Sequence, residues 1–495
     1  MPLIDGTHKK EAGTALRDRS LLTKGVHTIM GKYFGTDGFR GEANVTLTAD
    51  HAYRIGRFLG WYCREHDLSA PATDRVNAHR PCVVVGKDTR RSSYMFEYAI
   101  VAGLTASGAD AYMLHVTTTP SVAFVAARED FDCGIMISAS HNAYTDNGIK
   151  LVNRRGEKID DDTIEVIERY LDGGAAALGL TEDEMWHNDL PVATGADVGR
   201  IVDHVAGRNR YVGYLVSLAS HSYKGFRVGL DCANGSSWMI ARAVFEALGA
   251  KTYVTGAEPD GVNINVECGS THIDRLRRLV ESERLDVGFA FDGDADRCIA
   301  VDDKGNEING DHTMYVLAKY MKEMGRLENN TVVTTVMSNM GLYRALNDVG
   351  IDYVQTTVGD RFVYENMMQN GHVIGGEQSG HVILRKYATT GDGILTAIML
   401  MERIVDSKLP LSKLAEPVIM YPQVTVNIRV SDKDAVLSDP AILKARDELA
   451  ARLGDDGRIL LRKSGTEPLI RVMVEAPDKA TCESLAEELA RMIRE

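Results

Sequence analysis

The chain has 495 residues and a formal net charge of −14; 44% of its residues are hydrophobic and 25% are charged. This length suggests three or four domains with ample core, and the composition is ordinary for a globular chain. The acidic charge argues against a nucleic-acid partner, because phosphate backbones are bound by basic surfaces.

Targeting and redox signals are also absent from the sequence. Residues 1–30 lack the apolar core of a signal peptide, and no run of about eighteen apolar residues occurs, so we expect neither export nor a membrane span. The seven cysteines are scattered and never form a CxxC pair. They therefore indicate neither a disulfide framework nor a zinc site, and the pattern is typical of the cytoplasm.

Short apolar runs alternate with longer helical patterns along the chain, and this alternation predicts α/β domains. The runs expected to form strands are 82–85, 134–138, 228–230, 287–291 and 332–336. The segment 172–199, rich in Gly, Ala and acids, has the composition of a boundary linker, and the pattern shifts again at 420–423. Beyond that shift, strands at 458–461 and 469–474 and an amphipathic helix at 480–493 predict an α+β domain.

The first loop with chemical potential follows the run 134–138 and contains Ser140, His141 and Lys150. A serine hydroxyl becomes a useful nucleophile or phosphate carrier only beside a base and a cation, and this loop offers one of each. Taken alone the segment is ambiguous, because Ser, His and Asn also satisfy free backbone groups at strand ends. The downstream loops decide between these interpretations.

The second loop ends the run 287–291 and carries the carboxylates Asp292, Asp294 and Asp296. Three alternating negative charges repel one another unless a hard cation neutralises them, which indicates Mg²⁺ rather than a solvated acidic turn. An EF-hand needs Gly and Glu where Arg297 and Asp303 stand, so it is excluded. A phosphatase with a DxD nucleophile fits Asp292 and Asp294, but it leaves Ser140 unexplained.

Two more polar loops lie downstream. In 375–381, Glu377 and Ser379 are two apart and point the same way in an extended loop, which suits sugar hydroxyls; His381 ends the loop. The alternative is an ordinary glycine turn. In 462–471 a turn between two apolar runs offers hydroxyls, a glycine amide and guanidinium groups, which suit a phosphate dianion, although a charged β-turn has the same composition. Its candidate residues are Arg462, Ser464, Gly465, Thr466 and Arg471.

The four loops, in this order, resemble those of the α-D-phosphohexomutase superfamily, whose members carry phosphoserine, metal, sugar and phosphate loops, one per domain. The resemblance covers nearly the whole chain and extends to segments 33–41, 231–235 and 261–265. It implies three similar α/β domains and a smaller C-terminal α+β domain around a central cleft. The expected divisions are an extension 1–30 and domains 31–190, 191–305, 306–418 and 419–495.

The resemblance also implies an activity. Gln378 and Gly465 favour the branch of the superfamily that interconverts glucosamine 6-phosphate and glucosamine 1-phosphate, through a phosphoserine and a 1,6-bisphosphate, in the supply of UDP-N-acetylglucosamine. It implies one Mg²⁺ per subunit on Asp292, Asp294, Asp296 and the Ser140 phosphate. It further implies a cytoplasmic enzyme with a hexose 1,6-bisphosphate as activator or intermediate, a kinase for the first phosphorylation of Ser140, and a homodimer.

Roles for the remaining residues follow from the same resemblance. Lys150 and Arg40 would supply positive charge, and Arg297 would neutralise the phosphosugar. Lys150 and His381 are equal candidates for the general base, and His141 would transfer a proton or orient the loop. Glu377 and Ser379 would hold sugar hydroxyls. The other phosphate would lie on Arg462, Ser464, Gly465, Thr466 and Arg471.

Two positions depart from the superfamily pattern. Ala143 stands where a proline usually stiffens the serine loop, and Ala295 replaces a glycine of the metal loop, which disfavours a positive φ there. We interpret both as tuning. The alternative functions are a phosphomannomutase or phosphoglucomutase of broad specificity, a metal-dependent sugar-phosphate phosphatase, and a catalytically silent sugar-phosphate sensor.

Overall fold

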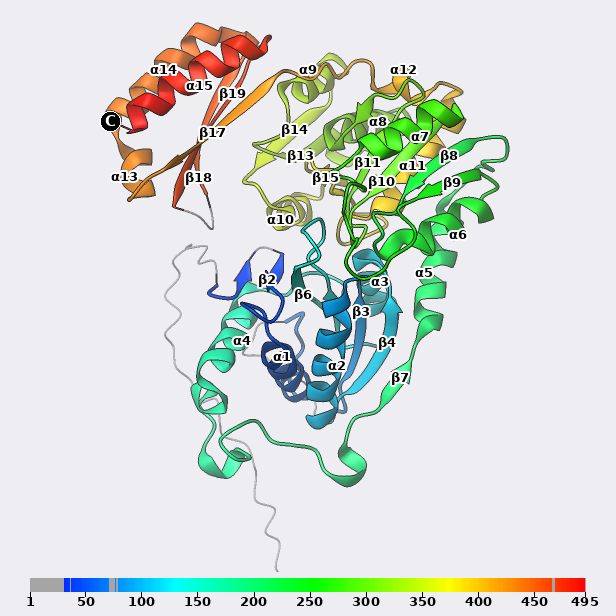
Figure 1. Ribbon diagram of the computed structural model, residues 1–495, viewed down its shortest axis with the longest axis vertical. Helices are drawn as coiled ribbons and strands as arrows, with labels where there is room; N and C mark the ends of the chain where they lie inside the picture. Colours follow the sequence, from blue (N-terminus) through cyan, green and yellow to red (C-terminus); the bar gives the residue numbers. More distant parts are fainter. Residues whose placement is uncertain (1–30, 36, 71–75, 77–78, 465–467, 495) are drawn as a thin grey trace, which may run out of the picture.

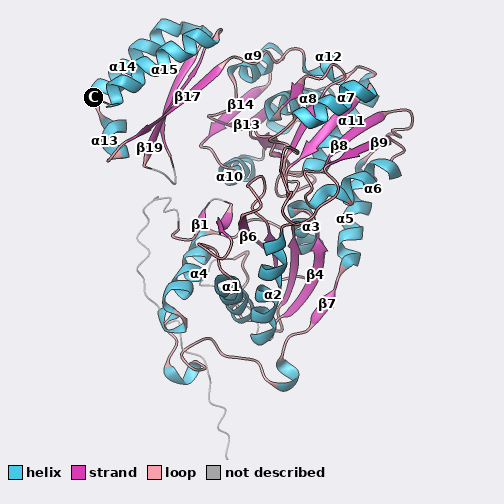
Figure 2. Ribbon diagram, in the orientation of Figure 1, coloured by secondary structure: helices cyan, strands magenta, loops and turns pink. Residues whose placement is uncertain are grey.

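The computed structural model describes residues 31–494 except 36, 71–75, 77–78 and 465–467. The predicted extension 1–30 lies outside the described residues. Four β-sheets follow one another along the chain, each with its own helices, and the last belongs to a smaller unit at the C-terminus (Figures 1 and 2). This confirms the predicted fold class of three α/β domains and a smaller α+β domain.

The first sheet has seven strands in the order β1-β2-β6-β5-β3-β4-β7. Its centre, β5-β3-β4, is parallel, and β6 and β2 extend one side with antiparallel pairing. The strands are β1 Phe34–Gly35, β2 Gly38–Glu42, β3 Cys82–Lys87, β4 Asp110–Val116, β5 Cys133–Ile137, β6 Asp146–Asn153 and β7 Ile201–Asp203. The helices are α1 Ala49–Tyr62, α2 Arg91–Ala106, α3 Thr119–Arg128 and α4 Asp161–Gly173.

This sheet extends past residue 190, where the first division was expected, because β7 pairs in parallel with Ala111–Met113 of β4. The predicted boundary linker 172–199 begins at the end of α4 and contains three short 3₁₀ turns, η1 Ala175–Leu178, η2 Glu182–Glu184 and η3 Gly195–Asp197. The chain leaves the first sheet only after Asp203.

The second sheet has the order β12-β11-β10-β8-β9, and β10 and β11 form an antiparallel hairpin. Because β12 pairs with β11, this sheet runs to residue 308, three residues beyond the expected division. Its strands are β8 Arg227–Asp231, β9 Lys251–Thr255, β10 Val287–Phe291, β11 Cys298–Val301 and β12 Glu307–Ile308. The helices of this part are α5 Val205–Leu218, η4 Ser236–Trp238, α6 Ile240–Ala247 and α7 Asp274–Glu283.

The third sheet has the order β14-β13-β15-β16. Its strands are β13 Thr331–Thr335, β14 Asp352–Thr356, β15 Ile374–Gly376 and β16 Val382–Leu384. Its helices are α8 Gly310–Glu323, η5 Glu328–Asn330, α9 Met340–Asp348, α10 Asp360–Asn370, α11 Gly393–Ser407 and α12 Leu411–Ala415. One continuous hydrophobic core joins the second and third sheets, with Phe289, Val332 and Ile398 among its members.

The C-terminal sheet has the order β17-β19-β18 and is fully antiparallel. Its core is a separate cluster, against which the last helix turns apolar side chains at spacings of three and four residues. Its elements are β17 Gln423–Arg429, α13 Lys433–Ser438, α14 Pro440–Leu453, η6 Gly454–Asp456, β18 Arg458–Lys463, β19 Leu469–Glu475 and α15 Lys479–Arg494.

Two global features complete the fold. All seven cysteines are free thiols, and all except Cys82 are buried. Among the helices of the described part of the chain, none combines the length and apolar character that a membrane span requires.

Candidate active site

The serine loop connects β5 to β6 and is fixed from beneath by a buried arginine. Arg90 donates hydrogen bonds to the carbonyl oxygens of Ser140 at 2.9 Å, Asn142 at 3.0 Å and Asp146 at 3.1 Å. The Asn265 amide donates to the Ser140 carbonyl as well, at 2.9 Å. This network holds Ser140 at a φ of 52°, a left-handed conformation that a non-glycine residue adopts only when its surroundings enforce it.

Arg90 also stabilises the serine loop at Ala143, where a proline usually stands. Arg90 also donates to the carbonyl oxygen of Ala143, so side-chain hydrogen bonds fix the loop where a proline ring is lacking. Arg90 is itself held by Asp88, with a distance of 2.7 Å from Nε to Oδ2, and both side chains are fully buried. The loop is therefore part of a rigid buried network.

The Ser140 hydroxyl lies where the serine loop meets the metal loop. Its Oγ donates to Asp292 Oδ2 and is 3.1 Å from His141 Nδ1. Burial and the nearby guanidinium groups of Arg297 and Arg40 lower the pKa of His141 to about 4, so its imidazole is neutral at pH 7. The predicted nucleophile thus faces one carboxylate and one neutral histidine.

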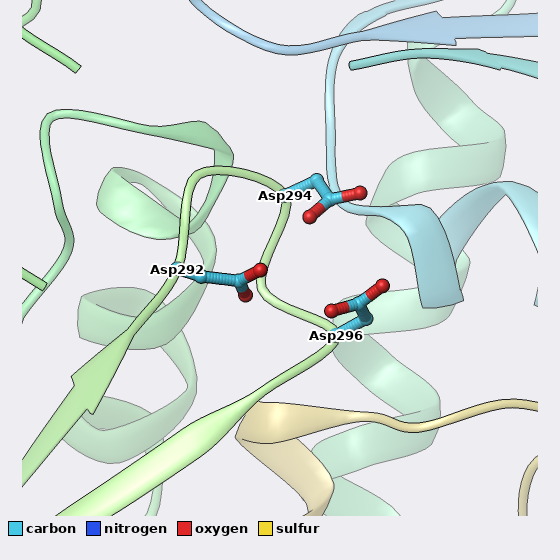
Figure 3. Close-up of side chains that lie close together, drawn as sticks. All are labelled: Asp292, Asp294 and Asp296. Atoms are coloured by element: carbon cyan, nitrogen blue, oxygen red, sulfur yellow. The ribbon is translucent and has the colours of Figure 1, made fainter. Parts of the chain in front are cut away.

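The metal loop is the turn between β10 and β11. Asp292, Asp294 and Asp296 are buried, and one carboxylate oxygen from each lies within 4.8 Å of the others. Figure 3 shows the three carboxylates gathered around this turn. A Cβ at Gly293 would lie 2.5 Å from the Ser140 carbonyl oxygen, so only glycine lets the two loops approach this closely. The three predicted aspartates and the predicted serine therefore form one site.

Ala295 adopts the positive φ that its side chain was expected to disfavour. Its φ is 58°, and its methyl group is buried in the core shared by the second and third sheets. The left-handed conformation costs an alanine about 1 kcal/mol, which burial of the methyl group can offset. The loop therefore keeps the shape that glycine would give it.

The carboxylates have the properties of a cation site. Asp294 Oδ1 and Asp296 Oδ1 are buried and accept no hydrogen bond from any described residue. Burial and the negative charges of Asp296 and Asp294 raise the pKa of Asp292 well above its usual range. Buried, mutually repelling oxygen ligands of this kind fit a hard divalent cation such as Mg²⁺.

Lys150 supplies the nearest protein cation. Its Nζ is 2.8 Å from Asp294, 3.1 Å from Asp296 and 3.1 Å from Asp37. Burial alone would lower the pKa of Lys150, but these carboxylates outweigh it and raise the pKa well above its usual range. Arg40, the other predicted cation, forms an ion pair with Asp37. Asp37 thus joins both cations to the site.

The predicted sugar loop connects β15 to β16 and meets the metal loop through His381. His381 Nδ1 is 3.7 Å from Asp296 Oδ1, and its Nε2 accepts a hydrogen bond of 3.0 Å from the backbone N–H of Gly391. Glu377 Oε1 accepts a hydrogen bond of 3.0 Å from the backbone N–H of Gly359. Ser379 Oγ is buried and has no hydrogen-bond partner among the described residues, which leaves it available to a ligand.

Arg297, at the end of the metal loop, is half-buried. Burial alone would lower its pKa, but the carboxylates of Asp292 and Asp296 outweigh that effect and raise it. The guanidinium group therefore stays charged beside the sugar and metal loops, as a phosphosugar would need.

The phosphate loop lies at one end of β18 and β19. Arg462 and Arg471 are cross-strand neighbours, and burial and the charge of Arg471 lower the pKa of Arg462. Two guanidinium groups side by side are stable when an anion lies between them. Ser464 is buried next to them. The predicted residues Gly465 and Thr466 lie outside the described residues.

Several residues of this site were missed by the sequence analysis. Arg90 and Asn265 shape the serine loop, and Asp37, Lys158 and Asp360 carry charges around the site. Asp37 and Asn265 lie within the segments 33–41 and 261–265 that carry part of the superfamily resemblance, which was their available signal. The others lie outside the four loops, and no residue pattern marks them.

Sequence models of the phosphoglucomutase/phosphomannomutase family match the chain in four pieces. The α/β/α domains I, II and III match residues 31–177, 209–305 and 309–421, and the C-terminal domain matches 426–492. Phosphoglucosamine mutase from Lachnospira eligens is 59% identical over 465 residues, covering 94% of this chain and 99% of the relative. The Bacillus subtilis phosphoglucosamine mutase is 44% identical, with the same shares covered.

Solved structures share the fold. A phosphoglucomutase/phosphomannomutase family protein from Burkholderia thailandensis has a TM-score of 0.72 at 22% identity, covering 92% of this chain and 96% of its own. An N-acetylphosphoglucosamine mutase from Aspergillus fumigatus, solved with GlcNAc-6P and magnesium, has a TM-score of 0.65 at 16% identity, covering 93% and 95%.

Proposed function

The chain belongs to the phosphoglucomutase/phosphomannomutase family, and on that premise we propose that it interconverts glucosamine 6-phosphate and glucosamine 1-phosphate through a phosphoserine at Ser140. The observation that carries the proposal is the contact of the strained, buried Ser140 with Asp292 of the aspartate cluster. Relatives at 44% and 59% identity that bear the name phosphoglucosamine mutase support the glucosamine substrate.

Phosphoryl transfer depends on positioning and on offsetting the charge of the transferring oxygens. Asp292, Asp294 and Asp296 would hold Mg²⁺ together with the Ser140 phosphate, and the bound ion would neutralise negative charge on the transferring group. Lys150 and Arg40 would add positive charge from the side of the first sheet.

The sugar would be held at both ends. Glu377 and Ser379 would bind hydroxyl groups, and Arg297 would balance the charge of the phosphosugar. The second phosphate would lie on the clamp of the C-terminal domain, with Gly465 and Thr466 as predicted members. Because either end of the hexose must reach Ser140, the clamp would accept either phosphate of the 1,6-bisphosphate in turn. The clamp residues that the structure describes are Arg462, Ser464 and Arg471.

Proton transfer at the sugar hydroxyl is assigned to a histidine. Lys150 is surrounded by three carboxylates, which favours a permanent cation over a base. Burial alone would lower the pKa of His381, but Asp360 and Asp296 outweigh it and raise the pKa to about 9, so His381 would donate a proton as a general acid, while His141 would orient the serine hydroxyl. A His381→Gln variant that keeps the wild-type pH–rate profile would remove this assignment.

Four associations stay predictions: activation by a hexose 1,6-bisphosphate, a kinase that first phosphorylates Ser140, a homodimer, and location in the cytoplasm.

The decisive experiment compares kcat/KM of phosphorylated enzyme with Mg²⁺ on glucosamine 6-phosphate, glucose 6-phosphate and mannose 6-phosphate. We expect at least a tenfold preference for glucosamine, about 1.4 kcal/mol in transition-state discrimination, and complete dependence on Ser140. A preference for mannose or glucose would move the chain to the broader mutases. Inorganic phosphate as the main product, retained in Ser140→Ala, would establish a phosphatase instead.

A further inference from the structure

A series of alternating charges runs from the metal loop through the first domain to the third. Asp296 lies 3.1 Å from Lys150 Nζ, and the same Nζ lies 3.1 Å from Asp37. Asp37 then lies 2.9 Å from Lys158 Nζ, which lies 2.7 Å from Asp360. Each carboxylate or ammonium group between the two ends therefore contacts opposite charges on both sides.

Asp37 and Lys158, two of the three inner members of this series, lie beside the active site without being part of its chemistry. Asp37 lies in the turn between β1 and β2, and Lys158 lies just beyond the end of β6. Burial alone would raise the pKa of Asp37, but Lys150, Lys158 and Arg40 outweigh it and hold the pKa well below its usual range. Asp37 is therefore a stable anion that binds two lysines at once.

The far end of the series reaches the sugar loop. Asp360 is the first residue of α10, and the residue before it, Gly359, donates its backbone N–H to Glu377 Oε1 at 3.0 Å. The position of the N-terminus of α10 therefore fixes the side chain that is proposed to bind the sugar. An unbroken set of contacts links Asp296 to Glu377 by way of the first domain.

Side chains from the first domain and from α10 bridge a cavity of about 290 Å³ at this place. Lys158 and Asp360 line the cavity, and so do Glu157 and Tyr364, whose hydrogen bond of 3.0 Å from hydroxyl to carboxylate also spans it. The ion pair of Arg361 with Asp161 is a further bridge between the first domain and α10, and His381 of the sugar loop lies 3.4 Å from Asp360.

We propose that Lys158 is a positioning residue, which through Asp37 and Asp360 sets the sugar loop at its working distance from Ser140. Lys158 touches neither the reacting oxygens nor the proposed metal site. Its effect is confined to reactions in which a sugar held by Glu377 must meet the phosphoserine. The proposal rests on the proposed function, because it concerns transfer between Ser140 and a sugar.

The test compares two fates of the phosphoryl group on purified, phosphorylated enzyme. Transfer to glucosamine 6-phosphate needs the sugar loop, whereas slow hydrolysis by water does not. For Lys158→Met we expect kcat/KM for the sugar to fall about 30-fold and the hydrolysis rate to stay within twofold. Lys158→Arg should recover most of the loss, because it keeps the charge between the two carboxylates.

A double-mutant cycle isolates the link. Asp360→Asn also removes the carboxylate 3.4 Å from His381 Nε2, so its loss should be at least that of Lys158→Met, and the double variant should lose no more than the larger single loss. Tyr364→Phe is the matched control: it removes the neighbouring hydrogen bond across the same cavity, leaves the charges unchanged, and should stay within twofold of wild type. Independent, multiplying losses would overturn the proposal, and so would wild-type transfer in Lys158→Met.

Two further outcomes are decisive. Parallel losses of transfer, hydrolysis and thermal stability in both single variants would show that Lys158 supports only the fold, which also overturns the proposal. If the proposed function is wrong, the wild-type enzyme itself will form no glucosamine 1-phosphate. If only the link is wrong, the wild type will form this product and the Lys158 variants will give one of the contradicting results above.

Discussion

The serine loop and the phosphate loop serve the same reaction but are built in opposite ways. Ser140 is almost completely buried, and Arg90 and Asn265 from distant parts of the chain hold its carbonyl group. The phosphate loop instead ends a three-stranded sheet whose domain has a hydrophobic core of its own. Figure 1 shows this domain set apart from the other three sheets.

The C-terminal domain joins the rest of the molecule partly through one buried carboxylate. Glu475 receives hydrogen bonds from Asn339 Nδ2 at 3.2 Å and the Met340 backbone at 3.3 Å, and Arg458 Nε lies 2.6 Å away. The comparison teaches that the reacting atoms are placed by a network inside the core, whereas the second phosphate is held by a separate unit on a narrow polar joint.

The largest effect is expected at the network of the reacting centre. Arg90→Met should lower kcat about 100-fold, because a displaced serine loop no longer aligns Ser140. It should also destabilise the fold by up to about 5 kcal/mol, since Asp88 loses its buried partner. Steady-state kinetics measure the change in kcat, and urea unfolding measures the change in stability. Arg90→Lys keeps the charge, so both of its values should lie between those of the wild type and Arg90→Met. Wild-type kcat in a destabilised Arg90→Met would contradict the comparison.

The polar joint, formed by Glu475 with Asn339, Met340 and Arg458, should affect KM rather than kcat. Glu475→Gln leaves Arg458 without its buried partner, and we expect a loss of about 4 kcal/mol confined to the C-terminal domain. Hydrogen exchange in α15 should accelerate while exchange in β5 does not. The KM for the phosphosugar should rise several-fold with little change in kcat. An equal loss of kcat would show that the two regions are not mechanically distinct.

The joint should also depend on pH through Asp311, which accepts a hydrogen bond of 2.7 Å from the Asn339 backbone. Burial raises the pKa of Asp311 to about 7, against about 4 in an unfolded chain. The resulting stability is fully present below pH 4 and is lost as the pH rises through 7. Between pH 5 and 8 the loss should be about 3 kcal/mol. Thermal unfolding should show this slope in the wild type and a smaller one in Asp311→Asn.

The smallest effect concerns backbone strain within the metal loop. Ala295→Gly removes the cost of a left-handed alanine but also a buried methyl group, so the net change in unfolding free energy should stay within about 1 kcal/mol. Activity with Mg²⁺ should be unchanged within twofold. A tenfold change in the Mg²⁺ concentration needed for half-maximal rate would show that the alanine tunes the metal site.

Much of the fold could be predicted because its central strands are strongly apolar. The runs at 82–85, 134–138, 228–230, 287–291 and 332–336 all became strands within a few residues. Ile201–Asp203 was missed, because three partly exposed residues give no such pattern and only their pairing with β4 makes them a strand.

Site residues could be predicted where they are close together in the sequence. They could not be predicted where residues far apart in the sequence meet only in the folded structure. The three aspartates are two residues apart, and Ser140 stands beside His141, so local chemistry was visible. Lys158 and Asp360 are more than 200 residues apart, and only the packing of α10 against the first domain brings them together. The conformation of Ala295 was hidden for a related reason: surrounding packing overrides its local preference.

The buried cysteines can report how often each part of the molecule opens. A thiol sealed in a core reacts with a labelling reagent only when its surroundings open, so its rate of modification measures local opening. Cys133 lies in the first sheet, Cys232 and Cys298 in the core shared by the second and third, and Cys482 in the C-terminal core. Thiol labelling of the wild-type protein should therefore measure the opening of each part separately. Among these four cysteines, Cys482 should react first.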